Sequence, residues 1–318
     1  MSGEFVISLD FELLWGVRDH ATRESYGANI LGGREAIPRI LELFERYEIA
    51  ATWATVGLLM AESRDELMAS LPPEELRPRY TNPSLSNYSY LNEVGEDERS
   101  DPHYYGMSLV RRIRDTPKQE IATHTHTHIY CLEEGQTIEA FDADLSAALR
   151  LAADKGIPLQ SIVFPRNQFS SKHLSVCLRQ GIDVYRGNPT PWAYRATDGI
   201  GQTPLRRALR LADAHSGILG AKTYDREGGQ PANVPASQFL RPKAGKLAAF
   251  HPAHIRTIKS AMTSAARQGR GYHLWWHPHN FGRDTSENLD ALEDVLKHFL
   301  KLKNETGFVS NPMESFGG

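Results

Sequence analysis

The sequence predicts an α/β protein built as a β/α barrel of about seven units. Short apolar segments alternate with amphipathic helical segments along nearly the whole chain of 318 residues. Strands that are separated by helices favour parallel pairing with right-handed crossovers. Polar and ionisable residues follow directly after the predicted strands, at the edge where β/α barrels assemble their active sites. A doubly wound open sheet is the alternative architecture.

The N-terminal half of the chain supplies the first three predicted strands. Its strands are expected at 4–10, 49–57 and 120–124, and its helices at 33–49, 58–63 and 137–156. The first of these helices is predicted from apolar residues at helical spacing, among them Ile37, Ile40 and Phe44. Gly156 and Pro158 supply the stop signal of the third helix.

The C-terminal half supplies the remaining elements. Strands are expected at 161–165, 182–187, 246–250 and 271–277, and helices at 170–181 and 286–303. Two stretches, 72–106 and 223–245, are rich in Pro, Gly, Asn, Ser and Tyr and lack periodicity. We predict them to be irregular insertions, which either run over the surface or frame a substrate groove. No linker divides the chain, so one domain is expected over residues 1–318.

The composition argues against nucleic-acid and membrane partners. The formal net charge is −3 with both signs evenly mixed, so the chain lacks the basic field that polynucleotide binding needs. No apolar stretch approaches the roughly 18 residues of a membrane span, and no signal-peptide pattern precedes the first strand. Only two cysteines are present, Cys131 and Cys177, which fits a reducing compartment. We therefore expect a cytoplasmic protein.

Five predicted strands end in side chains suited to catalysis or metal binding. These are Asp10 and Glu12, His124 with His126 and His128, Arg166 and Asn167, Arg186 and Asn188, and His277 with His279. Taken singly, each such residue is more often a cap or a solvated side chain. Their agreement at five strand ends predicts one shared site at the carboxyl edge of the barrel.

The stretch THTHTH (123–128) suggests a metal site. In a strand its three histidines would share one face, whereas in a helix or tight turn His124 and His128 would come together. Catalytic zinc commonly takes two histidines and one carboxylate, and other divalent transition metals accept the same ligands. Asp10 and Glu12 share one face of a strand, so one can bind the metal while the other acts as a base.

These residues resemble the motifs of the NodB-type polysaccharide deacetylases, carbohydrate esterase family four. ISLDFE (7–12) is similar to that family's first motif, an apolar strand that ends in two acids, although the family's acids are usually adjacent. HTHTH (124–128) resembles its His-Ser/Thr-x-x-His motif, and LWWHPHNFG (274–282) resembles its strand before the catalytic histidine. FPRNQ (164–168) and YRGNPTPW (185–192) lie where the family carries its arginine motif and its groove tryptophan. The chain is also similar to the WbmS-like deacetylases of O-antigen gene clusters.

The resemblance implies a role for each matched residue. The implied roles are general base for Asp10, metal ligands for Glu12, His124 and His128, general acid for His277, orientation of the base for Arg166, and sugar stacking for Trp192. Asn167, Arg186 and His279 are expected to contact the substrate. Two alternatives stay open, because either acid of the first motif can be the metal ligand and His279 can replace His277 as the acid. The family's four-residue spacing leaves His126 out of the ligand set.

The resemblance also implies a fold and an activity. The fold is a distorted (β/α)7 barrel, the NodB-homology fold, and the activity is metal-dependent removal of N-acetyl groups from an amino sugar or a sugar polymer or precursor. Surface-polysaccharide (O-antigen) biosynthesis is the expected setting. The expected cofactor is a divalent metal, Zn²⁺ first, with iron, cobalt or nickel as alternatives. The alternative functions are an allantoinase-like amidase or a deformylase, and a non-catalytic carbohydrate-binding homologue.

Overall fold

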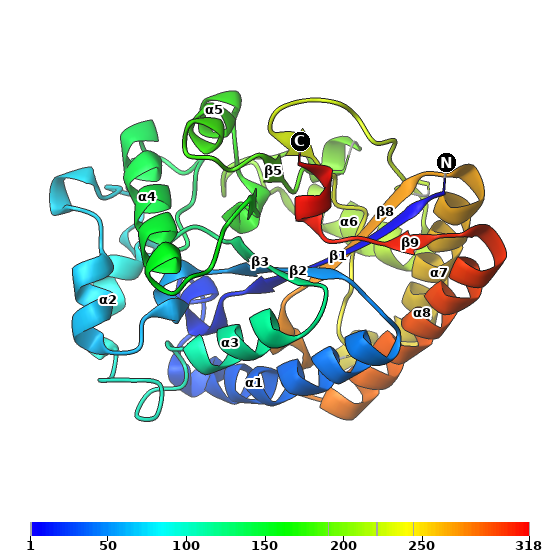
Figure 1. Cartoon of the computed structure of the whole chain (residues 1–318), viewed down its shortest axis with the longest axis horizontal. Coiled ribbons are helices and arrows are strands. Elements are labelled where there is room, and N and C mark those ends of the chain that lie inside the picture. The colour runs from blue at the N-terminus through cyan, green and yellow to red at the C-terminus, as the bar shows by residue number, and fades with distance from the viewer. Residues whose placement is uncertain (1, 190, 221, 244, 318) are drawn as a thin grey trace.

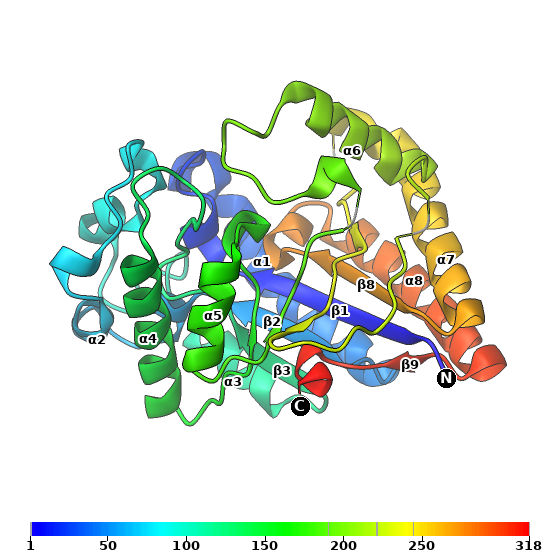
Figure 2. The same ribbon diagram turned by 90° about the horizontal axis from the view of Figure 1, so that it is seen from above.

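The strands form one curled parallel sheet, which confirms the predicted β/α barrel (Figure 1, Figure 2). The computed structural model describes residues 2–189, 191–220, 222–243 and 245–317. The strands pair in the order β6-β5-β4-β3-β2-β1-β8-β7, and β9 also pairs with β1. Their bounds are β1 Glu4–Phe11, β2 Ala51–Thr55, β3 Gln119–Thr123, β4 Ser161–Ile162, β5 Val184–Tyr185, β6 Ala232–Asn233, β7 Gln238–Phe239, β8 Gly271–Trp276 and β9 Val309–Ser310.

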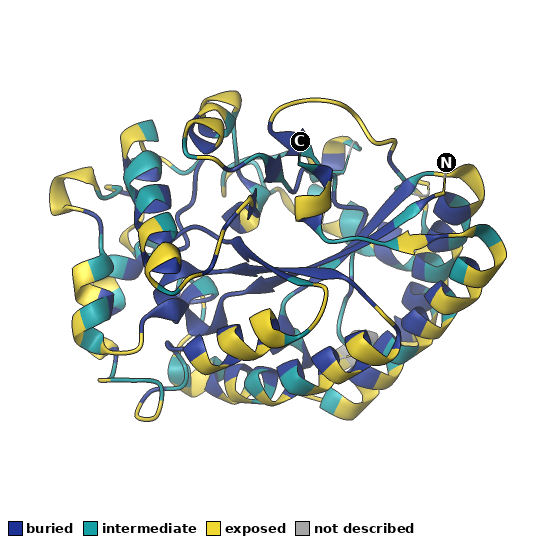
Figure 3. Cartoon of the chain, in the orientation of Figure 1, coloured by how far each residue is buried: buried dark blue, intermediate teal, exposed yellow. Residues whose placement is uncertain are grey.

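The helices surround the sheet, with their exposed faces turned outward and the strands buried between them (Figure 3). Their bounds are α1 Arg23–Arg46, α2 Arg64–Ser70, α3 Met107–Asp115, α4 Ile138–Asp154, α5 Ser171–Arg179, α6 Pro204–Ser216, α7 His251–Gln268 and α8 Thr285–Thr306. Across the part of the chain that the structure describes, none of these helices is both long and apolar enough to cross a membrane.

The barrel is distorted where its strands are short. β4, β5, β6 and β7 have two residues each. A single segment runs from β5 to β8 across the open side of the sheet: the N–H of Ala236 donates to Gly187 O at 2.9 Å, and the N–H of Ser237 donates to His273 O at 2.8 Å. One chain segment thus joins the two edges through β6 and β7.

Strand β1 separates two apolar clusters by the alternation of its side chains. Phe5, Ile7 and Leu9 pack in the large cluster toward the helices, whereas Val6 belongs to a smaller cluster with Met313 and other residues. Successive side chains of a strand point to opposite faces, so Ser8 and Asp10 share the face of Val6. That face leads from the small cluster up to the carboxyl edge of the sheet.

Several predicted elements need correction. The run 246–250, predicted as a strand, lies in a 3-10 helix, Gly245–Phe250, and the segment 223–245, predicted as an irregular insertion, contains β6 and β7. Residues 58–63, predicted as a helix, begin in the 3-10 helix Gly57–Met60. Strands of two residues are held by hydrogen bonds to neighbouring strands. They are too short to show an alternation of apolar and polar residues, so the sequence does not predict them.

Helix α1 begins ten residues before the predicted start at 33, because Thr22 caps it by accepting a hydrogen bond from the N–H of Ser25. Glycines at 27, 32 and 33 lower helix propensity and hid this part of the helix. A Cβ on Gly33 would lie 2.6 Å from the Cα of His279. The glycine therefore lets α1 approach the short helix Pro278–Phe281 at the edge of the site.

Glu120 on β3 makes folding stability depend on pH. Its carboxylate accepts hydrogen bonds from Thr52 Oγ1 at 2.6 Å and from the N–H of Glu314 at 3.0 Å, and burial raises its pKa to about 7. A carboxyl group whose pKa is raised on folding stabilises the protein when protonated, and that contribution disappears as the pH rises through about 7.

We expect Glu120→Gln to match the parent protein near pH 4.5 and to exceed its free energy of unfolding by up to about 3 kcal/mol at pH 8. Urea unfolding across this pH range measures the difference. Glu139→Gln, at an exposed position of α4, is the matched control and should show no such pH-dependent gain. An equal gain from both variants would contradict the assignment.

Candidate metal centre

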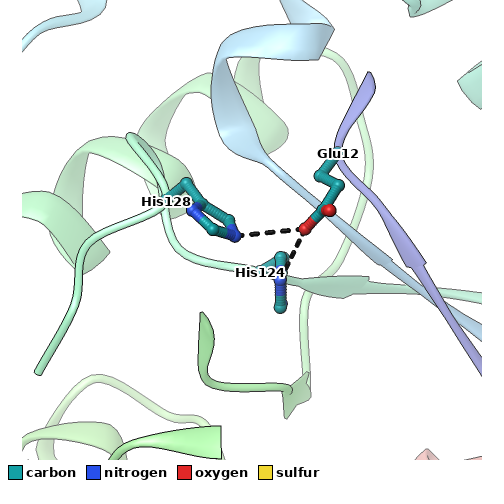
Figure 4. A group of neighbouring side chains, drawn as sticks. All are labelled: Glu12, His124 and His128. Carbon is teal, nitrogen blue, oxygen red and sulfur yellow. Dashed lines mark ion pairs between the residues drawn. The ribbon is translucent and has the colours of Figure 1, made fainter. Parts of the chain in front are cut away.

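Glu12, His124 and His128 converge at the carboxyl edge of the sheet (Figure 4). One carboxylate oxygen of Glu12 lies 3.3 Å from His124 Nε2 and 3.1 Å from His128 Nε2. All three side chains are buried, and their ligand atoms lie within 4.8 Å of one another. Glu12 comes from the end of β1, and the two histidines come from the turn after β3. The predicted two-histidine, one-carboxylate group is therefore brought together.

The turn after β3 is shaped to present its first and last histidines. Thr125 and His128 adopt left-handed φ values of 63° and 58°. The buried carboxylate of Asp144 on α4 accepts hydrogen bonds from the N–H of His126 at 2.7 Å and the N–H of Thr127 at 3.1 Å. Asn87 of the 72–106 insertion donates to Thr127 O at 3.0 Å. The insertion therefore packs against the turn and supports it.

His126 points away from the centre. Its Nε2 lies 3.0 Å from Ser70 Oγ on α2, and burial lowers its pKa to about 3. The turn thus separates His126 from His124 and His128, as the four-residue spacing implied.

The arrangement fits a divalent metal. His124 Nδ1 lies 2.7 Å from Val163 O, so that nitrogen carries the hydrogen and, in the neutral ring, Nε2 directs a lone pair at Glu12. Two lone pairs 3.3 Å apart repel each other, and a proton or a metal ion between them removes that repulsion. Ligands bound to a tetrahedral zinc at about 2.1 Å lie about 3.4 Å from one another. The two separations between Glu12 and the histidines, 3.3 and 3.1 Å, are close to that value.

The electrostatics keep Glu12 ionised, the form that binds a metal. Burial by itself would raise the pKa of Glu12, but His277, His124 and His128 hold it well below its usual range. Burial lowers the pKa of His128. Gly16 lies so close to the Glu12 carboxylate that a Cβ there would overlap it.

Asp10 is held by Arg186 in the interior of the barrel. The guanidinium donates to both carboxylate oxygens, at 2.6 and 2.8 Å, and to Ser8 Oγ at 3.0 Å. Burial opposes ionisation of Asp10, but the charge of Arg186 and its hydrogen bonds lower the pKa of this carboxyl. Glu12 is thus the acid next to the histidines, and Asp10 is the acid that pairs with Arg186.

Arg166, expected to orient the base, has other partners than Asp10 in the structure. Arg166 pairs with Asp19 and Glu133 and lies 4.2 Å from the ring centroid of Tyr130. Its φ of 52°, followed by 52° at Asn167, turns the chain so that Arg166 leaves the barrel interior. Arg186 takes the place beside Asp10.

Arg186, expected to contact the substrate, lines neither of the two cavities described below. It is fully buried, and its guanidinium lies 4.3 Å from the ring centroid of Trp275. Arg186 Nε and Nη2 donate hydrogen bonds to Asn167 Oδ1 at 3.2 and 3.0 Å. Asn167 therefore belongs to the hydrogen-bonded group of Asp10 and Arg186, and it also lines the two cavities described below.

His277 is better placed than His279 to protonate a leaving group. His277 Nε2 lies 3.7 Å from Asp10 and 3.6 Å from Glu12, and the side chain is 24% exposed. His279 lies deeper, 4.0 Å from Glu12, and burial lowers its pKa to about 3. Tyr26 packs edge-on against the ring of His279, and His277 is the more exposed of the two histidines.

Two adjoining cavities open from the centre. The inner cavity, about 570 Å³, contains Asp10, Glu12 and both histidine ligands. The outer cavity, about 670 Å³, is lined by the segment after β5, α6 and β7. The two share the lining residues Arg166, Asn167, Phe239, Trp275 and His277.

The aromatic walls of these cavities differ from the prediction. Trp192, expected to flank the sugar, is 46% exposed, lines neither cavity and has the guanidinium of Arg206 5.4 Å from its ring centroid. Phe239 and Trp275 form the wall between the two cavities instead. Phe239 escaped notice because it lies in the segment predicted as an insertion.

A buried polar chain behind the site was also missed. His273 Nε2 lies 2.8 Å from Ser8 Oγ, and its Nδ1 lies 3.2 Å from Val234 O. Ser8 and His273 lie inside mainly apolar strands. The only sequence signal for them was the alternation of side chains along each strand, which turns these two toward the interior.

We expect Arg186→Met to lower the free energy of unfolding by about 3 kcal/mol or more, because it leaves the buried Asp10 carboxylate without its partner. Arg166→Met removes a partly exposed guanidinium and should cost about 1 kcal/mol or less. Urea unfolding of both variants compares them. Equal losses would contradict the placement of Arg186 as the partner of Asp10.

We expect Asp144→Ala to weaken Zn²⁺ binding by about 10- to 100-fold, since it removes the acceptor that shapes the histidine turn. Isothermal titration with Zn²⁺ measures the loss. Asp154→Ala, an exposed change on the same helix, is the matched control. Unchanged Zn²⁺ affinity in a folded Asp144→Ala protein would show that the turn does not depend on this carboxylate.

Comparisons with known proteins find likeness at the level of structure. No protein-family model matches the sequence, and no curated protein sequence matches it significantly. A protein from Mycobacterium smegmatis described as a polysaccharide deacetylase has a TM-score of 0.57 at 12% identity, over 99% of this chain and 89% of that chain. One from Pseudomonas aeruginosa PAO1 with the same description has a TM-score of 0.56 at 10% identity, over 98% and 88%.

The Puue allantoinase has a TM-score of 0.54 at 12% identity, over 96% of this chain and 85% of that chain. At such identities a structural likeness establishes the fold and leaves the chemistry to the residues of the site. The chain therefore has the distorted barrel found in proteins described as polysaccharide deacetylases and in an allantoinase.

Proposed function

We propose that this chain is a metal-dependent hydrolase that removes the N-acetyl group from an amino sugar. The observation that carries the proposal is the convergence of three groups on one cavity: the Glu12–His124–His128 cluster, the Asp10–Arg186 pair and His277. A metal site, an ionised base and a candidate acid within reach of each other are the parts that amide hydrolysis requires.

Glu12, His124 and His128 would hold a divalent metal, with Zn²⁺ preferred and iron, cobalt or nickel as alternatives. The metal supplies Lewis-acid polarisation of the amide carbonyl and makes water a better nucleophile.

Asp10 acts as the base in this proposal. Arg186 keeps its carboxylate ionised and fixes its orientation, so Asp10 can take the proton of the attacking water. His277, 3.7 Å from Asp10, protonates the departing amine as the carbon–nitrogen bond breaks. Acetate and a free amino sugar leave. Asn280 Oδ1, 3.3 Å from His277 Nδ1, holds the imidazole in orientation.

A sugar fits the cavities better than a small cyclic amide does. The outer cavity of about 670 Å³ continues beyond the reacting centre, and Phe239 and Trp275 line the passage between the two cavities. Aromatic side chains offer apolar faces for a sugar ring. Both base and acid are present, which disfavours a non-catalytic homologue. Surface-polysaccharide (O-antigen) biosynthesis in the cytoplasm is part of the proposal and rests on the sequence resemblance alone.

We expect the protein to bind one divalent metal and to release acetate from N-acetylated amino sugars. Asp10→Asn should retain the metal and lose about 100- to 10,000-fold in kcat, because it removes only the base. His128→Gln should lose both metal and activity. Elemental analysis of the purified variants and an enzymatic acetate assay measure the two properties.

His126→Gln is the matched control, since it changes a histidine of the same turn that points away from Glu12; it should keep its metal. Retention of metal and activity by His128→Gln would refute the ligand assignment. Absence of acetate release from nucleotide sugars, lipid-linked sugars and oligosaccharides alike would refute the deacetylase function.

A further inference from the structure

The outer cavity is strongly basic. Besides Arg166 it is lined by Arg195, Arg207, Arg210 and Arg241. Arg207 and Arg210 stand three residues apart on α6 and therefore share a helix face, while Arg195 precedes that helix and Arg241 follows β7. As far as the chain is described, the cavity has no acidic lining residue, and only Arg166 of the five takes part in an ion pair.

The nearby carboxylates already have partners of their own. Asp213 on α6 lies 2.5 Å from Lys222 Nζ and accepts from the hydroxyl of Tyr194 at 2.7 Å. Glu133 accepts hydrogen bonds from Arg166 and Gln168. Neither acid lines the cavity, so the positive charge of the four remaining arginines is uncompensated there.

The arginines are held together at an energetic cost. Burial, together with the charges of Arg206, Arg207 and Arg241, lowers the pKa of Arg210, and burial lowers the pKa of Arg241. The Nε atom of Arg241 is buried with no hydrogen-bond partner among the described residues. A cleft lined by one sign of charge concentrates ligands of the opposite sign, so an anion bound here would relieve the repulsion.

The anion site and the reacting centre are joined by a short passage. His277, Phe239 and Trp275 line both cavities. Figure 2 shows α6 at the periphery of the barrel, next to α7. A ligand whose amide reaches His277 and whose ring passes Phe239 and Trp275 would place its next substituent among the arginines.

We propose, building on the deacetylase function above, that the substrate is an N-acetylated amino sugar bearing a phosphate or diphosphate ester, and that this anion binds Arg195, Arg207, Arg210 and Arg241. Guanidinium groups match phosphate oxygens bidentately, which is why arginine predominates where phosphates are recognised. Four uncompensated charges suit a diphosphate. A single carboxylate, as in a uronic acid, would leave most of them unpaired.

Kinetics of acetate release tests this substrate class. The compounds are N-acetylglucosamine 1-phosphate, UDP-N-acetylglucosamine, a short-chain prenyl-diphosphate N-acetylglucosamine and the neutral trisaccharide of N-acetylglucosamine. We expect kcat/KM to favour the phosphorylated compounds. The double variant Arg207→Gln/Arg210→Gln should lose about 10- to 100-fold in kcat/KM for them and leave the neutral trisaccharide unchanged.

Arg256→Gln is the matched control, because Arg256 is an exposed arginine of the neighbouring helix α7 and does not line the cavity. It should behave as the parent protein does with every compound. The three phosphorylated compounds separate a bare sugar phosphate, a nucleotide sugar and a lipid-linked sugar as the source of the anion.

Binding measurements separate this inference from the proposed function. Isothermal titration of the parent and the double variant with UDP-N-acetylglucosamine needs no turnover. Binding that the double variant loses, without acetate release from any compound, would support the anion site and refute the deacetylase. Acetate release that is equally fast from neutral and phosphorylated sugars, and unaffected in the double variant, would refute the anion site alone. A preference for an N-acetylated uronic acid over every phosphorylated compound would also overturn it.

Discussion

The ion pair between Arg186 and Asp10 constrains the whole interior of the barrel. A fully buried guanidinium is tolerated only when its donors are satisfied, and Arg186 satisfies them on Asp10 and Ser8 of β1 and on Asn167 in the turn after β4. The ring of Trp275 on β8 lies against the guanidinium. Arg186 thus connects β1, the end of β5 and β8. It also keeps the carboxylate of Asp10, the candidate base, ionised. The core of the barrel and the candidate site at its edge therefore depend on the same interaction.

The metal centre is built on a second buried acid. One carboxylate oxygen of Glu12 lies within 3.3 Å of the Nε2 atoms of His124 and His128. Asp144 on α4 accepts hydrogen bonds from the turn that carries these histidines and so shapes it. The histidine turn is held by backbone hydrogen bonds to Asp144 and by the carbonyl of Val163, so the protein itself fixes how His124 and His128 are oriented. Such preorganisation is what lets outer partners tune metal affinity.

The inner and outer cavities are built from different parts of the fold. Asp10, Glu12, His124, His128 and His277, the candidate reacting groups, lie at the ends of β1, β3 and β8. The outer cavity is formed by α6 and by the segments around β5 and β7. Function on a shared barrel commonly changes through such peripheral segments. The likeness to proteins described as polysaccharide deacetylases and to an allantoinase therefore leaves the substrate to be decided by the arginines and aromatic side chains of this chain.

The sequence by itself determined the fold class, the strands β1, β2, β3 and β8, and the three residues that converge in the candidate metal centre. These strands have five to eight residues, whereas β4 to β7 have two each. Their last residues meet at one edge whenever parallel strands adjoin. The tertiary structure alone decided which arginine meets Asp10, because that choice depends on the left-handed turn at Arg166 and on β5 lying beside β4. It alone placed Phe239 in the groove and Trp192 outside it, since two-residue strands are held by hydrogen bonds to neighbours distant in the chain and leave no local pattern.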